Sequence, residues 1–182
     1  MNLRIDKYFS LNEIALMSIC GAMVFVMKII FKIPLHIPGH SGIFWVIPLI
    51  VGVSIVKKPG AGIYIGLISG LLSSFFGIGA LHIFDVFKFV GVGLATDVCS
   101  VMFAYRYDSI AVGVITGAVA NIVKMVINYT LQLFVGVQPF FIIVGIGVSS
   151  FTHIIFGGLG GLISVLIIRR LTRAGVIGEK EG

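Results

Sequence analysis

The sequence predicts an all-α membrane protein of six transmembrane helices, with both termini in the cytoplasm. Of its 182 residues, 58% are hydrophobic and only 11% are charged, whereas a soluble domain has about 45–50% apolar and about 25% charged residues. Positions 59–84 and 125–168 contain no Asp, Glu, Lys or Arg, and one helical crossing needs about 20 apolar residues. The chain therefore crosses the bilayer several times.

Glycine, proline and charged residues divide the chain into six apolar segments, which we expect to be the spans. They are 11–31, 42–56, 60–76, 84–104, 109–134 and 139–168. The second and third are short, so flanking residues must reach the interface or the bilayer must thin locally. The spans make one transmembrane domain, and 169–182 is a basic cytoplasmic tail. The first apolar segment runs on through Lys28 as far as Lys32 without a small-residue cleavage pattern before them, which argues against a cleaved secretory signal.

The basic residues fix the expected orientation. The connections 33–41, 77–83 and 135–138 contain no Lys or Arg. The opposite side collects nine: Arg4, Lys7, Lys57, Lys58, Arg106, Arg169, Arg170, Arg173 and Lys180. Because cytoplasmic connections are enriched in Lys and Arg, we expect that side to face the cytoplasm. This bias accounts for most of the net charge of +6 without a nucleic-acid partner.

Small residues recur at intervals of four in two of the segments. Gly62, Gly66 and Gly70 follow this spacing in the third, and Gly113 and Gly117 follow it in the fifth. In lipid, such spacing lets two helix backbones approach closely. These stripes are expected to be helix contacts.

Ionisable residues within spans are costly and often functional. Six remain after the connections are assigned: Lys28, Lys32, Asp85, Lys88, Asp97 and Lys124. On the fifth span, Asn121, Lys124, Asn128 and Gln132 fall within about 80° of helical arc. This polar stripe, running from the middle of the bilayer to its outer surface, predicts a solvated cavity.

The other charges have simpler alternatives. Asp85 and Lys88, spaced i,i+3, are able to neutralise each other, and Lys32 and Lys88 lie close enough to the outer interface to snorkel. Asp97 points away from Lys88, and we expect it to make an interhelical contact nearer the cytoplasm.

The connection 33–42 holds two prolines, two glycines, His36 and His40, and Trp45 follows it. Proline stiffens such a loop and glycine supplies its turns. At the mouth of a polar cavity it is expected to act as a lid, and an interfacial turn anchored by Trp45 is the alternative.

The sequence contains no phosphate-binding loop and no nucleotide-binding glycine motif. It also lacks a Ser/His/Asp or paired-carboxylate arrangement for hydrolysis. We therefore expect no enzyme activity and no cofactor, and any energy that the protein needs must come from elsewhere.

This pattern resembles the substrate-binding (S) components of energy-coupling factor (ECF) transporters, which are ABC-type importers of micronutrients. The resemblance covers the whole chain and rests on six spans, the segment around Pro38-Gly-His-Ser-Gly42 and the glycine-rich third span. It implies a gating loop between the first two helices and a substrate cavity in the outer half. It also implies a multi-pass protein of a prokaryotic plasma membrane, in contact with lipid.

The resemblance further implies partners: a transmembrane coupling subunit and two ATPases. The family's Ala-x-x-x-Ala docking motif on the first helix corresponds here to Ser18-Ile-Cys-Gly-Ala22, with Ala15 one turn earlier. Metal-specific relatives carry a histidine directly after the initiator Met, whereas this chain has Asn2, which argues against nickel or cobalt.

The charge of the expected cavity predicts a small anionic substrate, such as a vitamin or precursor carrying a carboxylate or phosphate. The expected substrate-binding residues are Lys28, Lys32, His36, His40, Asp85, Lys88, Asn121, Lys124, Asn128 and Gln132. One alternative is a metal ion held by His36, His40, His82 and Asp85, although the adjacent lysines would repel it. Another is a self-sufficient proton-coupled carrier, for which Asp97 would be the relay.

Overall fold

The structure is a computed structural model that describes residues 8–31, 38–77 and 81–175. These residues form six α-helices and one short 3-10 helix. The elements are α1 (Leu11–Ile30), α2 (Gly42–Val56), α3 (Ala61–Phe75), η1 (His82–Phe84), α4 (Asp85–Met102), α5 (Ile110–Phe134) and α6 (Pro139–Arg173). The predicted all-α architecture of six helices is confirmed.

The helices differ in length and polarity. Leu11–Ile30, Ile110–Phe134 and Gly145–Arg173 are long and apolar enough to cross a membrane, and α2 and α3 are shorter apolar helices. The 18-residue helix α4 carries Asp85, Lys88 and Asp97. The chain is a multi-pass membrane protein, and α6 continues as a helix five residues beyond the expected end of the last span.

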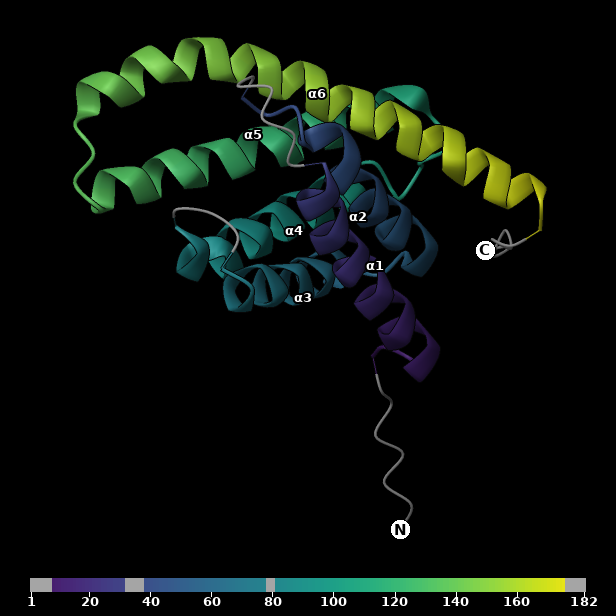
Figure 1. Ribbon diagram of the computed structural model, residues 1–182. Coiled ribbons are helices and arrows are strands. Elements are labelled where there is room, and N and C mark those ends of the chain that lie inside the picture. The colour runs from purple at the N-terminus through teal and green to yellow at the C-terminus, as the bar shows by residue number, and fades with distance from the viewer. Residues whose placement is uncertain (1–7, 32–37, 78–80, 176–182) are drawn as a thin grey trace.

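Helices α5 and α6 lie side by side and extend past the shorter helices, as Figure 1 shows. Helices α3 and α4 form a second close pair, and α2 contacts all five other helices. Trp45, Val46, Ile50 and Val53 of α2 are fully buried. The core is therefore built around α2. The ring of Trp45 lies next to the polar face of α5.

Glycine makes both close helix pairs possible. A Cβ atom at Gly66 would lie 2.2 Å from the carbonyl oxygen of Phe89 on α4. One at Gly117 would lie 2.2 Å from the carbonyl oxygen of Gly157 on α6. No real side chain tolerates such distances, so the predicted contact stripes are confirmed.

Asp97 ties α4 to the start of α3. Its carboxylate accepts hydrogen bonds from the backbone N–H groups of Gly62 (2.8 Å) and Ile63 (3.0 Å). These are two of the N–H groups that a helix leaves unpaired in its first turn. Gly60, at the N-cap position, has no side chain to bind them, so a residue of α4 caps α3. The expected interhelical contact of Asp97 is confirmed.

The connections rich in basic residues meet at one end of the bundle. Lys58, between α2 and α3, binds Glu13 at the start of α1 at 2.7 Å. Arg169, near the end of α6, donates to the backbone oxygen of Asp108 before α5. We call this end, formed by 8–13, 57–60, 103–109 and 168–175, the basic end.

Candidate functional site

A cavity of about 650 Å³ opens at the end of the bundle opposite the basic end. It lies between α1, α4, α5 and α6, and it is bordered by the connection before α2. Its walls are Lys28, Pro38, Gly39, Ser41, Leu81, Asp85, Lys88, Asn121, Lys124, Met125, Asn128, Tyr129, Gln132, Val135, Val137, Ser149 and His153. This volume accommodates a vitamin-sized molecule.

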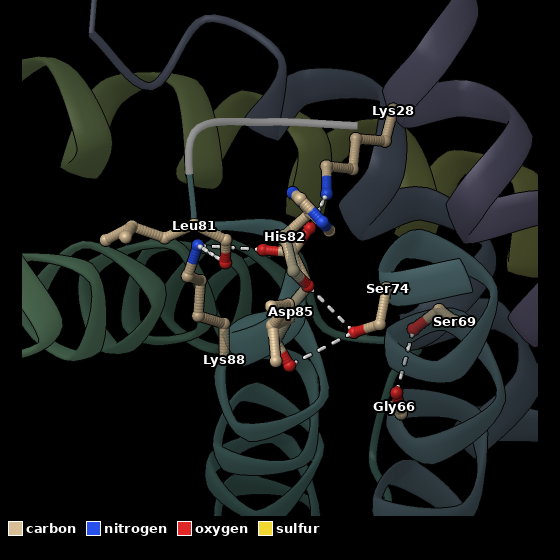
Figure 2. A network of polar contacts seen from close by, with 9 residues as sticks. Lys28, Gly66, Ser69, Ser74, Leu81, His82, Asp85 and Lys88 are labelled. Carbon is tan, nitrogen blue, oxygen red and sulfur yellow. Dashed lines mark hydrogen bonds and ion pairs between the residues drawn. The ribbon is translucent and has the colours of Figure 1, made fainter. Parts of the chain in front are cut away.

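Two lysines share one carboxylate on the α1 and α4 side of the cavity. Lys28 Nζ lies 2.5 Å from Asp85 Oδ2, and Lys88 Nζ lies 2.7 Å from Asp85 Oδ1. Lys88 also reaches the backbone oxygen of Leu81 at 3.5 Å. Figure 2 shows both ammonium groups converging on Asp85, which is only 3% exposed. Since both carboxylate oxygens carry an ion pair, one positive charge of this group is left uncompensated.

The third lysine of the cavity has aromatic neighbours. Lys124 Nζ lies 4.2 Å from the ring centroid of Trp45 and 5.1 Å from that of Phe89. These distances are typical of cation–π interactions, which are stronger where water is excluded. Among the described residues, no carboxylate forms an ion pair with Lys124. The ammonium group of Lys124 therefore packs against the rings of Trp45 and Phe89, and the residue lines the cavity.

The amides of α5 divide into two kinds. Asn121 is 1% exposed, and its Nδ2 donates to the backbone oxygens of His153 (3.0 Å) and Gly39 (3.3 Å). It thus joins α6 to the connection before α2. Asn128 and Gln132, about two and three turns further along α5, line the cavity. The side chain of Asn121 is hydrogen-bonded to backbone oxygens, whereas the side-chain amides of Asn128 and Gln132 line the cavity.

Three polar cavity residues of α5 and α6 were not anticipated from the sequence. Tyr129 and Ser149 join α5 to α6 through hydroxyls 2.7 Å apart. His153 Nδ1 lies 2.7 Å from the backbone oxygen of Ser149, and its ring faces the cavity beside Gly39. The i,i+4 spacing of Ser149 and His153 on α6 is the one signal that a reading of the sequence offers for them.

Of the ten residues expected to bind substrate, seven line the cavity: Lys28, Asp85, Lys88, Asn121, Lys124, Asn128 and Gln132. His40 is described but does not line it, and Lys32 and His36 lie outside the described residues. For the metal alternative, no group of three or more His, Cys, Asp or Glu within the described ranges is arranged to hold an ion. His82 contributes its backbone oxygen to Ser74 Oγ at 2.8 Å.

Residues 12–123 match the family described as "ABC-type cobalt transport system, permease component". The match extends over more than half of the chain. The chain belongs to this family. No curated protein matches this chain significantly.

The chain also resembles a solved structure, described as "Crystal structure of an S-component of ECF transporter". The TM-score is 0.64 at 17% identity, with 93% of this chain and 88% of that chain covered. At this identity the likeness shows the fold. The S-component fold that the sequence predicts is confirmed.

The face of the chain that we expect to dock on a coupling subunit lies along α1. Ala15 is exposed and Ala22 is half-buried. Ser18 faces inward: its Oγ donates to the backbone oxygen of Ile14 at 2.8 Å and lies 3.2 Å from Tyr64 Oη on α3. Ile19 and Met23 are exposed beside them. Ala15 and its apolar neighbours, rather than Ser18, are free to meet a partner.

Proposed function

We propose that this protein is the substrate-binding S component of an ECF-type importer and captures a small anionic micronutrient at the outer face of a prokaryotic plasma membrane. The S-component fold and the family of transport permeases support this role. The cavity supports the substrate class. The protein itself performs no catalysis, and transport is driven by partner ATPases.

The observation that carries the substrate class is the charge of the cavity. Within the described part of the chain, three ammonium groups line it, from Lys28, Lys88 and Lys124, against the single carboxylate of Asp85. Inside a protein cavity, a fixed surplus of positive charge attracts an anion more strongly than it would in bulk water. Asn128 and Gln132 add hydrogen-bonding groups for the polar remainder of the ligand.

A metal ion is the second candidate, because the family description names cobalt. The set His36, His40, His82 and Asp85 would supply suitable ligands. Against it, Lys28 and Lys88 already hold both oxygens of Asp85, and their charges would repel a cation. A proton-coupled carrier has less support, because Asp97 binds backbone N–H groups of α3 instead of opening into the cavity.

The proposed orientation puts the basic end in the cytoplasm and the cavity outside, in accord with the positive-inside rule. A single cysteine at position 40, in a chain whose Cys20 and Cys99 are replaced, tests it. A reagent that cannot cross the membrane should label this cysteine in intact cells. Labelling only after the inner face is exposed would reverse the orientation.

The proposed partners are a transmembrane coupling subunit and two ATPases, with α1 as the docking face. Replacing Ala15 by Leu enlarges a small exposed residue of this face, and it should weaken copurification of the coupling subunit without changing ligand affinity. Replacing Ile29, an exposed residue near the other end of α1, by Phe is the matched control. Equal assembly of both variants with the wild type would remove Ala15 from the interface.

A thermal-shift screen of the purified protein tests the proposed substrate class. The panel pairs carboxylate- and phosphate-bearing vitamins and precursors with neutral analogues, nucleobases and divalent metals including Co²⁺. Stabilisation by one anion, but not by its neutral analogue, is the expected result. Stabilisation by Co²⁺ alone would instead establish the metal reading.

A further inference from the structure

A second pocket, of about 520 Å³, lies at the basic end. It is enclosed by the end of α2, the connection between α4 and α5, and the last turns of α6. The residues lining it are Ser54, Lys57, Ala104, Tyr105, Arg106, Tyr107, Asp108, Ile168, Arg169, Thr172 and Arg173. It shares no residue with the cavity described above, and the proposed transport function does not use it.

The pocket carries a concentrated positive charge. Among the residues that the structure describes, the pocket is lined by the basic residues Lys57, Arg106, Arg169 and Arg173 and by one carboxylate, that of Asp108. Arg169 is held in place, because its Nε and Nη2 donate to the backbone oxygen of Asp108 at 2.8 and 2.6 Å. Within the described ranges, the side chains of the other three basic residues form no hydrogen bond or ion pair. Their donors are therefore available to a ligand.

The backbone around the pocket is strained. Among the described residues, Lys57 (φ 51°), Ala104 (φ 48°) and Tyr105 (φ 57°) are the non-glycine residues with positive φ, and all three line this pocket. Such conformations cost about 1–3 kcal/mol each and persist where the surroundings enforce them, often at functional sites.

A buried tyrosine fixes this strained connection. Tyr107 is 2% exposed, and its hydroxyl lies 2.6 Å from Ser100 Oγ. Ser100 uses its own hydrogen for the backbone oxygen of Thr96, so Tyr107 is the donor. Burial raises the pKa of Tyr107 to about 12, so the phenol keeps this proton. Arg106 and Asp108, on either side of it, are thereby held at the rim of the pocket.

An apolar groove continues from the same arginines along α6. It is lined by Ile163, Leu166 and Ile167 together with Arg169, Arg170 and Arg173. Arg169 and Arg173 line both the groove and the basic pocket. The combined site is therefore cationic where α6 ends and apolar where α6 enters the span.

We infer that this combined site binds an anionic phospholipid of the inner leaflet, with its phosphate headgroup in the basic pocket and an acyl chain along the groove. Arginine suits the headgroup because its planar fork matches phosphate oxygens. Basic pockets at the cytoplasmic ends of transmembrane helices are suited to such headgroups. A soluble phosphate compound would use the pocket but not the groove. An acidic protein partner would not need a groove directed into the bilayer.

Purified protein in a neutral detergent tests the proposal with three probes: phosphatidylglycerol, phosphatidylcholine with the same acyl chains, and glycerol 3-phosphate. The double variant R106Q/R173Q removes two charges whose side chains make no bond within the described chain, so the fold should tolerate it. Lys58→Gln is the control, because it removes a basic residue of the same end that lines neither the pocket nor the groove.

Native mass spectrometry and thermal shift should show wild-type protein binding phosphatidylglycerol in preference to the other two probes. The double variant should bind it about thirtyfold more weakly, because each basic residue at an anionic surface contributes roughly a factor of five, while Lys58→Gln should bind it as the wild type does. Equal binding of the two lipids would overturn the proposal. So would equal protection by glycerol 3-phosphate, which would indicate a soluble ligand. Unchanged lipid binding by R106Q/R173Q together with lost assembly with the coupling subunit would assign the pocket to a protein partner.

Discussion

The two carboxylates of α4 show how differently the two ends of this molecule use the same group. Asp85 and Asp97 lie twelve residues apart on one helix and are 3% and 5% exposed. Asp85 is neutralised by two ammonium groups beside an open cavity. The carboxylate of Asp97 instead accepts hydrogen bonds from backbone N–H groups where α3 and α4 are in close contact.

The two aspartates differ in role because the residues around them differ. Glycine at Gly62 and Gly93 brings the backbones of α3 and α4 together around Asp97, so its carboxylate serves the fold. Around Asp85, lysines of α1 and α4 supply long cationic side chains, and α5 and α6 leave a space in front of them. Buried ion pairs contribute little net stability, so the arrangement around Asp85 is consistent with the ligand binding that we propose for this cavity.

Removing the charge of Lys124 should have the largest effect. Losing a charged partner of a buried anion costs about 2–5 kcal/mol, so Lys124→Ala should weaken binding of the ligand found by the screen by about 30-fold to several thousand-fold. Isothermal titration calorimetry measures this.

Two further substitutions separate charge from shape at this position. Lys124→Met keeps most of the length and should bind as weakly as Lys124→Ala. Lys124→Arg should recover affinity only in part, because a guanidinium does not reproduce the compact ammonium group. If Lys124→Met bound the ligand as tightly as the wild type, the lysine would be a structural charge held by Trp45 and Phe89.

Asp97→Ala should lower stability without changing ligand affinity. It leaves the N–H groups of Gly62 and Ile63 buried without acceptors, at a cost of about 1–3 kcal/mol. Equilibrium unfolding in SDS measures this cost. Asp97→Asn keeps one oxygen acceptor, so its free energy of unfolding should fall by less than that of Asp97→Ala. A large loss of affinity in folded Asp97→Ala would show that the two ends of α4 are not independent.

Asp85→Asn should have a smaller effect on binding. It removes a negative charge from the cavity and releases Lys28 and Lys88, so the affinity for the anion should stay within about tenfold of the wild type or rise. If the substrate were a metal ion, Asp85→Asn should instead weaken its binding, because Asp85 would be a ligand to the ion. A loss of anion affinity beyond tenfold would show that the ion pairs are needed to position the lysines.

The smallest effect is expected at the surface of the basic end. Lys58→Gln breaks the pair with Glu13, whose side chains are 31% and 20% exposed. Exposed pairs contribute about 0–1 kcal/mol, so the SDS unfolding free energy should change by less than 1 kcal/mol. A larger loss would mean that this contact, and not the capping by Asp97, secures the start of α3.

Much of the fold could be predicted because its signals are local in sequence. Hydropathy and glycine spacing located the helices and the contact stripes, and the helical period brought Asn121, Lys124, Asn128 and Gln132 onto one face. The opposed direction of Asp97 and Lys88 on α4 separated the structural acid from the cavity.

The rest depends on pairing between helices, which periodicity does not encode. Lys28 reaches Asp85 across fifty-seven positions, although the sequence paired Asp85 with Lys88 alone. The contact of Lys124 with Trp45 depends on how deeply α2 is buried. His153 was missed because its i,i+4 spacing from Ser149 does not by itself show that this side of α6 faces the cavity. The pocket at the basic end was not predicted, because the positive-inside rule already accounted for its arginines.

Comparing an anionic ligand with its neutral counterpart tests the central claim most directly. The wild-type protein is titrated by calorimetry with the anion identified in the screen and with the carboxamide or dephosphorylated form of the same molecule. If the lysines of the cavity recognise charge, the neutral form should bind at least about 30-fold more weakly. Equal affinity for the two forms, or tight binding of Co²⁺ that displaces the anion, would contradict the account.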